Sequence, residues 1–321
     1  MPITADVSHE MSPLVAVAGP TASGKSALAL ELAARFGGEI LNCDSLQLYR
    51  GLDIGTAKTP PAQRRGISHH LIDVLDPSEI STAGDYARRA REVLQDVTFR
   101  GALPIVAGGT GFYLRALVDG LAEGPGRNDD LRARLSAIEI RHAGRLHRLL
   151  TRLDPAVAAR IHPNDANKLI RAVELCILQR KPATELFLQG RSALQGFRVL
   201  KIVLDPERAA LHARIGERTR AMFAAGLIEE VRLLLAEGVP ATAKPFESIG
   251  YREALAVIGG TLSLDQAIEL TTIATRQYAK RQLTWFRRES AVQWIHGFGD
   301  DPQVTENVIQ ITSDFLHKLQ A

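Results

Sequence analysis

Short continuous apolar runs recur along the first third of the chain, and between them apolar residues return every three or four positions. The first pattern is typical of a strand buried on both faces, and the second of an amphipathic helix. The predicted strands are LVAVA (14–18), EILNC (39–43), HLIDV (70–74) and LPIVA (103–107), and the predicted helices span about 25–36, 83–98 and 112–118. This alternation predicts a parallel sheet with helices on both faces.

The pattern changes after the Gly-rich and acidic stretch GLAEGPGRNDD (120–130), because the following fifty residues contain helical periods without a convincing strand. Strand-like runs return at RVLKIVLD (198–205) and VQWIH (292–296), and helices are predicted at about 207–225, 227–237, 265–288 and the end of the chain. We therefore predict an α/β fold in three parts. Residues 1–122 form the first part of a P-loop NTPase-like core, 123–196 an all-helical insertion, and 197–321 the second part of the core with C-terminal helices.

The first predicted strand and helix are joined by GPTASGKS, which matches G-x-x-x-x-G-K-[ST] at every fixed position. The two glycines let backbone N–H groups wrap an anion, and the helix start adds its positive end. The lysine supplies a charge, and the final serine a hydroxyl for Mg²⁺. The alternative is a strand-to-helix turn that binds nothing. The predicted phosphate site comprises Gly19, Pro20, Thr21, Ala22, Ser23, Gly24, Lys25 and Ser26, with Mg²⁺ as a cofactor held partly by Ser26.

A carboxylate near this loop is needed to decide its chemistry, since hydrolytic P-loop enzymes use a second strand that ends in Asp to position magnesium. The strand LPIVA instead runs into Gly-Gly-Thr, and Asp44 follows the strand EILNC. Functional groups gather at the carboxyl ends of strands in such sheets, so Lys25, Asp44 and Thr110 are expected to face one crevice. The alternative is that Asp44 caps a turn and Thr110 caps a helix.

Composition excludes several classes of protein. The chain has 321 residues, 45% of them apolar, and a formal charge of +3, which indicates a globular protein but does not establish a nucleic-acid partner. Cys43 and Cys176 are the only cysteines, so neither a disulfide framework nor a zinc site is indicated, and a cytoplasmic location is expected. The polar N-terminal residues 1–13 are interpreted as a loose tail instead of a signal, and the absence of a long apolar run argues against a membrane partner.

Positive charge is unevenly distributed. Residues 127–180 carry eleven Lys or Arg against six Asp or Glu, and 274–288 carry five basic residues and no acid, together with Tyr278, Trp285 and Phe286. Cations combined with aromatic side chains suit a nucleic-acid surface. The alternative is an ordinary solvated helix face. Arg276, Lys280 and Arg287 recur at near-helical spacing, which places them on one side of a helix.

The strings GPTASGKS, CDSLQLYRGLDIGTAK, HHLIDVLDP, GGTGFYLRAL, IHPNDANKLIRAVE, SIGYRE and AKRQLTWFRR together resemble the tRNA dimethylallyltransferase family, in its bacterial form. The resemblance implies transfer of a dimethylallyl group from dimethylallyl diphosphate to the exocyclic N6 amine of the adenosine 3′-adjacent to the anticodon in tRNA. It further implies that the loop holds the leaving diphosphate with Lys25 and Arg218, that Asp44 is the base and that Thr110 contacts the reacting region.

The resemblance also implies which residues contact tRNA, with the insertion closing around the anticodon arm. Leu46 departs from the family, in which Arg often occupies this position. One active site is complete within the chain, so no obligatory protein partner is expected. The implied tRNA-contacting residues are Asp44, Ser45, Leu46, Gln47, Thr110, Asn167, Lys168, Leu169, Ile170, Arg171, Arg276, Lys280, Arg281 and Arg287.

Three alternatives are retained. An adenylate dimethylallyltransferase uses the same chemistry on free AMP, ADP or ATP, although it has no need for the basic stretches. A small-molecule kinase binds ATP on the P-loop and transfers a phosphoryl group. An RNA-binding module with a relic P-loop binds tRNA without turnover.

Overall fold

The structure, a computed structural model, describes residues 11–320. Residues 1–10, most of the stretch interpreted as a loose tail, lie outside the described residues. The chain forms two compact units, one made of residues up to 118 together with those from 194 onward, and the other of residues 119–193. We call them the core unit and the insertion. The bounds of the insertion differ by a few residues from the predicted 123–196.

Six parallel strands form the sheet of the core unit, in the order β3-β2-β4-β1-β5-β6. The predicted α/β class is therefore confirmed. The strands are β1 (Ser12–Ala18), β2 (Gly38–Asn42), β3 (His69–His70), β4 (Leu103–Gly108), β5 (Phe197–Asp205) and β6 (Val292–His296).

One predicted strand is much shorter than expected. The run HLIDV was predicted to be a strand over 70–74, but β3 contains only His69 and His70. Leu71 and Asp73 have φ values of 59° and 57°, and this left-handed conformation cannot continue a strand. Asp73 instead forms an ion pair with the buried side chain of Lys58, at 2.5 Å.

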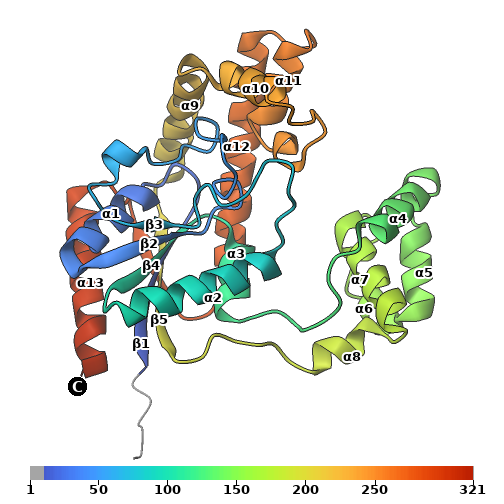
Figure 1. Cartoon of the computed structure of the whole chain (residues 1–321), viewed down its shortest axis with the longest axis horizontal. Helices are drawn as coiled ribbons and strands as arrows, with labels where there is room; N and C mark the ends of the chain where they lie inside the picture. The colour runs from blue at the N-terminus through green and yellow to red at the C-terminus, as the bar shows by residue number, and fades with distance from the viewer. Residues whose placement is uncertain (1–10, 321) are drawn as a thin grey trace, which may run out of the picture. The chain divides into compact units, whose positions relative to one another are not determined.

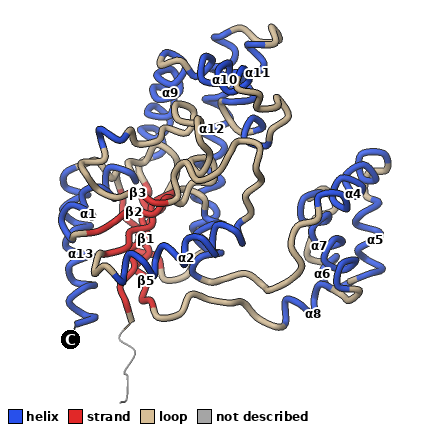
Figure 2. The backbone as a smooth tube through the Cα atoms, in the orientation of Figure 1, coloured by secondary structure: helices blue, strands red, loops and turns tan. Residues whose placement is uncertain are grey.

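Helices cover both faces of the sheet (Figure 1, Figure 2). On one face, α1 (Lys25–Phe36) and α13 (Pro302–Gln320) pack on alternate residues of the central strands, and this core includes Val15, Val17, Leu28, Leu32, Ile105, Ile202, Leu204 and Val308. The other face is covered by α2 (Ala83–Phe99) and α3 (Gly111–Val118). Successive residues of each strand face opposite sides of the sheet, so both sides carry apolar side chains that helices can cover.

The remaining helices of the core unit come late in the chain and pack on one another. They are α9 (Arg208–Ala224), α10 (Leu227–Ala236), α11 (Tyr251–Ile258) and α12 (Leu264–Phe286), with 3₁₀ turns η1 (Pro61–Gln63) and η2 (Lys244–Glu247) in connecting segments. Ser263 begins α12 with a capping box, in which its hydroxyl accepts from Gln266 N and Gln266 caps Ser263 N in return.

The insertion is helical throughout its described elements. It contains α4 (Asp129–Arg141), α5 (Arg145–Leu153), α6 (Pro155–Ala158), α7 (Ala166–Gln179) and α8 (Ala183–Leu188), with Leu135, Leu146, Leu150, Leu169 and Val173 in its own apolar core. The chain leaves and re-enters the core unit at one point, since Leu194 N donates to Val118 O at 2.9 Å. Among residues 11–320, no helix has the length and apolar character needed to cross a membrane.

Candidate active site

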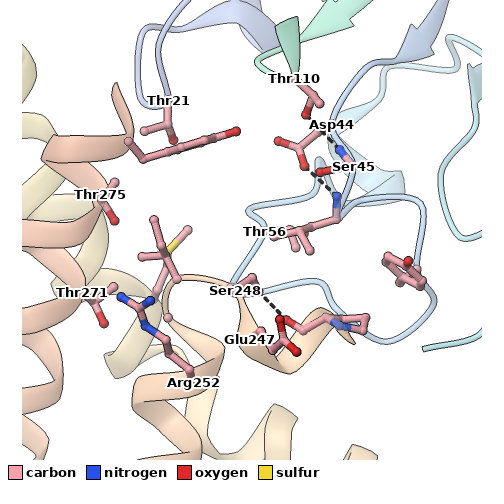
Figure 3. Close-up of a pocket in the computed structure, with 18 of the residues that line it drawn as sticks. Thr21, Asp44, Ser45, Thr56, Thr110, Glu247, Ser248, Arg252, Thr271 and Thr275 are labelled. Atoms are coloured by element: carbon pink, nitrogen blue, oxygen red, sulfur yellow. Dashed lines mark hydrogen bonds between the residues drawn. The ribbon is translucent and has the colours of Figure 1, made fainter. Parts of the chain in front are cut away.

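A cavity of about 640 Å³ lies in the core unit, where the loops after β1, β2 and β4 meet helices α9, α11 and α12. Figure 3 shows Thr21 and Thr275 on one side of it, and Asp44, Ser45 and Thr110 on the other. The three loops follow the carboxyl ends of neighbouring strands, so the topology of the sheet brings them together. Of the three residues expected to face one crevice, Asp44 and Thr110 line this cavity, whereas Lys25 is not among its lining residues.

The loop Gly19–Ser26 has the backbone of an anion cradle. Gly19 and Gly24 have φ values of 144° and 85°, a region that side-chain-bearing residues rarely adopt. A Cβ on Gly19 would also lie 2.9 Å from Leu204 O. Helix α1 begins directly after Gly24, at Lys25, so its free N–H groups and positive end point at the loop.

Lys25, in the phosphate-binding loop, has a strongly shifted pKa. The pKa of its ammonium is lowered to about 7, mainly by burial and also by the nearby Arg218, while Asp44 opposes the shift in part. Its Nζ donates to Pro20 O at 2.6 Å. A bound anion would restore the charged form, because an opposite charge favours it. The lowered pKa therefore indicates a cation held ready for a negatively charged ligand.

Asp44 is held firmly at the end of β2. Asn42, which is 3% exposed, accepts from Asp44 N at 2.9 Å and donates to Asp44 O at 3.0 Å and to Leu71 O at 2.9 Å. Leu46 N donates to Asp44 Oδ1 at 2.9 Å. These bonds fix the carboxylate and do not engage Oδ2, so one oxygen remains to act on a ligand.

Thr110 joins the β4 loop to the residues around Asp44. Its backbone N donates to Cys43 O at 3.1 Å, and its hydroxyl accepts from Ser45 N at 3.1 Å. Cys43 itself is buried, which raises the pKa of its thiol to about 12, so it is an inert packing residue. Thr110 also precedes α3, and Tyr113 N donates to its carbonyl at 2.9 Å.

The resemblance implied that Arg218 contacts the diphosphate, and the structure separates it from its neighbour Arg220 on α9. Arg218 lines the cavity, and its burial lowers its pKa, an effect that Asp44 opposes. Arg220 is exposed and does not line the cavity. Lys25 and Arg218 thus form a pair of cations in the neighbourhood of the Asp44 carboxylate.

The residues implied in tRNA contact have different surroundings in the core unit. Ser45, Leu46 and Arg281 line the cavity, whereas Gln47 donates from its amide to Thr56 O at 3.0 Å. On α12, Arg276 is partly buried and donates to His212 O at 3.4 Å. Lys280 and Arg287 are exposed.

In the insertion, the segment 167–171 is divided by the helix period. Asn167 and Lys168 are exposed. Leu169 and Ile170 are 0% and 8% exposed, and their side chains belong to the apolar core of the insertion. Arg171 donates to Glu174 at 2.7 Å and to Pro125 O at 2.9 Å.

Several cavity residues were not singled out from the sequence. Thr219 and Met222 come from α9, Ser248 and Arg252 from the η2–α11 region, and Thr271 and Thr275 from α12. Tyr278, one of the aromatic residues noted in the basic stretch, also lines the cavity. The string SIGYRE contributed to the resemblance, but no role was assigned to Ser248 or Arg252. In the sequence, hydroxyl and basic residues on amphipathic helices have the pattern of a solvent-exposed face. They line the cavity only because these helices pack against the loops of the sheet.

A metal ion would need ligands beyond side-chain carboxylates here. Among the described residues, no group of three or more His, Cys, Asp or Glu side chains is arranged to hold one. Ser26 is exposed beside Lys25, so its hydroxyl is accessible to a metal that a phosphate ligand also coordinates. Mg²⁺ commonly binds through one or two protein oxygens plus substrate phosphates, so this residue fits such an ion.

Comparisons with known proteins agree with this geometry. The family model described as IPP transferase matches residues 47–289. The chain is 56% identical to a tRNA dimethylallyltransferase of Solibacter usitatus over 95% of this chain and 99% of that protein. It is 54% identical to one of Koribacter versatilis over 93% and 97%, respectively.

Solved structures give the same result. A tRNA isopentenylpyrophosphate transferase from Bacillus halodurans aligns with a TM-score of 0.71 and 34% identity, over 96% of this chain and 98% of that one. A eukaryotic dimethylallyltransferase acting on tRNA aligns with a TM-score of 0.82 and 27% identity, over 96% and 80%. The chain therefore belongs to the IPP transferase family, among the tRNA dimethylallyltransferases.

Proposed function

We propose that this protein transfers the dimethylallyl group of dimethylallyl diphosphate to the N6 amine of the adenosine 3′-adjacent to the anticodon in tRNA, releasing diphosphate. One observation carries the proposal: a single cavity has Thr21 and Ala22 of the phosphate-binding loop in its lining together with the oriented carboxylate of Asp44. The relatives named tRNA dimethylallyltransferases support the acceptor class.

The donor's diphosphate would lie on the loop Gly19–Ser26. As the allylic C–O bond breaks, its electron pair stays with the diphosphate, and preorganised donors and cations lower the barrier by stabilising that charge. Backbone N–H groups at the start of α1, Lys25 and Arg218 supply them. Lys25, with its pKa near 7 in the free protein, gains its proton fully when the anion binds.

The acceptor amine would approach from the side of Asp44. Its nitrogen lone pair forms the new bond to the allylic carbon, and one amine proton passes to the carboxylate as positive charge develops on nitrogen. The adenine must leave its stack in the anticodon loop to reach Asp44 in the cavity. Thr110 would keep the region around Asp44 in place through Ser45 N and Cys43 O.

Mg²⁺ is part of the proposal, with Ser26 as its protein ligand. When bound with the diphosphate, the ion would add positive charge next to the leaving group. Lys25 and Arg218 would add positive charge near the same leaving group from the protein's side. The other proposed contacts with tRNA are Lys280, Arg281 and Arg287 on α12, and Asn167 and Lys168 on the insertion. A cytoplasmic location and the lack of an obligatory protein partner remain part of this proposal.

The test is to incubate the purified protein with Mg²⁺, dimethylallyl diphosphate, unmodified tRNA and AMP in one tube, and to identify prenylated nucleosides by mass spectrometry. Prenylation of the adenosine 3′ of the anticodon is expected. Prenylated AMP with unmodified tRNA would favour an adenylate dimethylallyltransferase. Absence of any prenylation, together with consumption of ATP in a parallel tube to which ATP is added, would favour the kinase alternative.

Arg218 and Arg220 give a matched pair for the donor side. Both lie on α9 two residues apart, but only Arg218 lines the cavity. Arg218→Ala is expected to weaken inhibition by inorganic diphosphate and to lower turnover, whereas Arg220→Ala leaves both close to wild type. Equal effects of the two substitutions would remove Arg218 from the donor site.

A further inference from the structure

The amide of Gln282 connects two loops of the cavity. Gln282 is 5% exposed on α12, and it is not among the residues that the sequence suggested. Its Oε1 accepts from Thr21 N at 2.8 Å, and its Nε2 donates to Gly109 O at 2.8 Å. One side chain therefore bonds to backbone groups that lie 261 and 173 residues away from it in the sequence.

The two bonded groups belong to the two halves of the proposed reaction. Thr21 lies in the loop that would hold the diphosphate. Gly109 directly precedes Thr110, whose hydroxyl holds Ser45 N beside the proposed base. Gln282 thus completes a short path of hydrogen bonds from the donor loop to the residue next to Asp44, entirely within the core unit.

The glycines of the β4 loop are explained by this contact. A Cβ on Gly109 would lie 2.2 Å from Gln282 Nε2, and one on Gly111 would lie 2.2 Å from the Trp285 ring. Gln282 and Trp285 are three residues apart and so project from the same side of α12. Gly109 and Gly111 therefore have no room for a Cβ, because side chains of α12 lie against their backbone.

A second set of contacts holds α3 against the same end of α12. The Arg115 guanidinium lies 4.2 Å from the centre of the Trp285 ring, and it donates to Glu289 Oε1 at 2.6 Å and 2.9 Å. Packing alone is thus already provided by Trp285 and Arg115. The amide of Gln282 adds fixed directions and distances at the two loops, which apolar packing does not supply.

The bond to Thr21 also limits which backbone N–H groups of the loop Gly19–Ser26 can bind an anion. Its N–H is committed to Gln282, and Ser23 N donates to Pro20 O at 3.3 Å, so the backbone donors left for an anion are those of Ala22 and residues 24–26. A fixed Thr21 therefore sets where the diphosphate sits relative to the β4 loop.

We propose that Gln282 is a positioning residue, which fixes the distance between the leaving diphosphate and the Asp44 carboxylate by joining the P-loop to the Gly109–Thr110 loop. The inference rests on the proposed prenyl transfer. A misplacement of about 1 Å between reacting groups can lower the rate by roughly 10²-fold, so the effect should appear in kcat, and tRNA affinity should stay unchanged.

Gln282→Met tests this, because methionine has a similar length and neither donates nor accepts a strong hydrogen bond. The single-turnover rate at saturating donor and tRNA is expected to fall by roughly 10- to 100-fold. Phe286→Leu is the matched control. Phe286 is on the same helix, but it is 1% exposed and does not line the cavity, so its side chain belongs neither to an RNA-facing surface nor to the site, and it offers no such hydrogen bond. It should lower the melting temperature without the loss in rate.

A second readout does not depend on activity. Hydrogen exchange at the Thr21 amide should be slow in the wild type and faster in Gln282→Met, while Phe286→Leu leaves it slow. If Gln282→Met does not fold, Gln282→Glu replaces it, since glutamate has the same shape and loses the donor to Gly109 O. It should lose rate as well.

The outcomes separate the two hypotheses. A wild type that prenylates tRNA, combined with a folded Gln282 variant of unchanged rate, would overturn the positioning role and leave the proposed function intact. A wild type that prenylates nothing would overturn the proposed function. In that case unchanged Thr21 exchange in Gln282→Met would overturn the connection between the loops as well.

Discussion

The two units of this protein present their charged groups in opposite ways. In the core unit, Lys25 and Arg218 are largely shielded from water beside Asp44, and their pKa values are lowered mainly by burial. In the insertion, Lys168 is exposed and is paired with Asp165 at 2.5 Å. Reactive groups need a fixed and partly dehydrated setting, whereas attraction of a polyanion needs only accessible cations.

Buried charge in the insertion has a structural use. Glu174 is 0% exposed and accepts from Arg132 at 3.0 Å and from Arg171 at 2.7 Å. It also accepts from the backbone N of Asn128, the N-cap residue of α4. This cluster fastens α4 to α7, so two of the basic residues counted in the sequence serve the fold of the insertion. The comparison predicts that the rate of the reaction depends on the buried groups of the core unit. It also predicts that the affinity for tRNA depends on exposed cations.

The largest effect is expected from Asp44→Asn, which keeps the shape and removes the base. General-base catalysis contributes typically 10² to 10⁴ in rate, so kcat should fall by about that factor. Binding of tRNA, measured in parallel by filter retention, should change little. A variant with wild-type kcat would contradict the assignment of Asp44.

The pH dependence of donor binding should give the next largest effect. Diphosphate favours protonated Lys25, whose pKa in the free protein is about 7, so affinity for the donor should fall as pH rises above 7, by up to about tenfold per pH unit. Lys25→Met should bind donor weakly and lack this contribution at every pH. Parallel profiles for both proteins would show that Lys25 does not titrate in this range.

The same pKa has a consequence for stability without ligand. The folded protein holds the Lys25 proton less tightly than the unfolded chain, whose model value is 10.5. The unfolded state then binds more protons between pH 7 and 10.5, so this group makes the folded state more stable as pH rises through that window. Lys25→Met should be more stable than the wild type at pH 7, as measured by urea unfolding, and equal stability would contradict the shift.

A smaller effect is expected from exposed cations. Lys280→Ala and Arg287→Ala should weaken tRNA binding several-fold and each flatten its salt dependence by about one unit of slope. Lys168→Ala should change the slope less, because Asp165 already neutralises part of its charge. Salt slopes that match the wild type for all three would make these helix faces ordinary solvated surfaces.

Much of this picture could be predicted from the sequence, and the exceptions have physical reasons. Apolar runs located the strands, because a parallel sheet is buried on both faces, and the strand ends then brought Asp44 and Thr110 together. Leu71 and Asp73 shortened β3 through backbone conformations that an apolar run does not reveal. Gln282 and Arg252 were missed because their partners are set by packing of distant segments, which periodicity does not encode.

The most direct test of the division between units is to excise the insertion. Val118 O and Leu194 N are joined by a hydrogen bond of 2.9 Å, so a short Gly/Ser linker can replace residues 119–193. We expect the excised protein to keep its affinity for inorganic diphosphate, measured by calorimetry. Its affinity for tRNA should fall by at least about tenfold, because the loss of a few phosphate contacts is enough to cause a decrease of that size. A folded variant that loses diphosphate binding, or that binds tRNA as the whole chain does, would contradict the account.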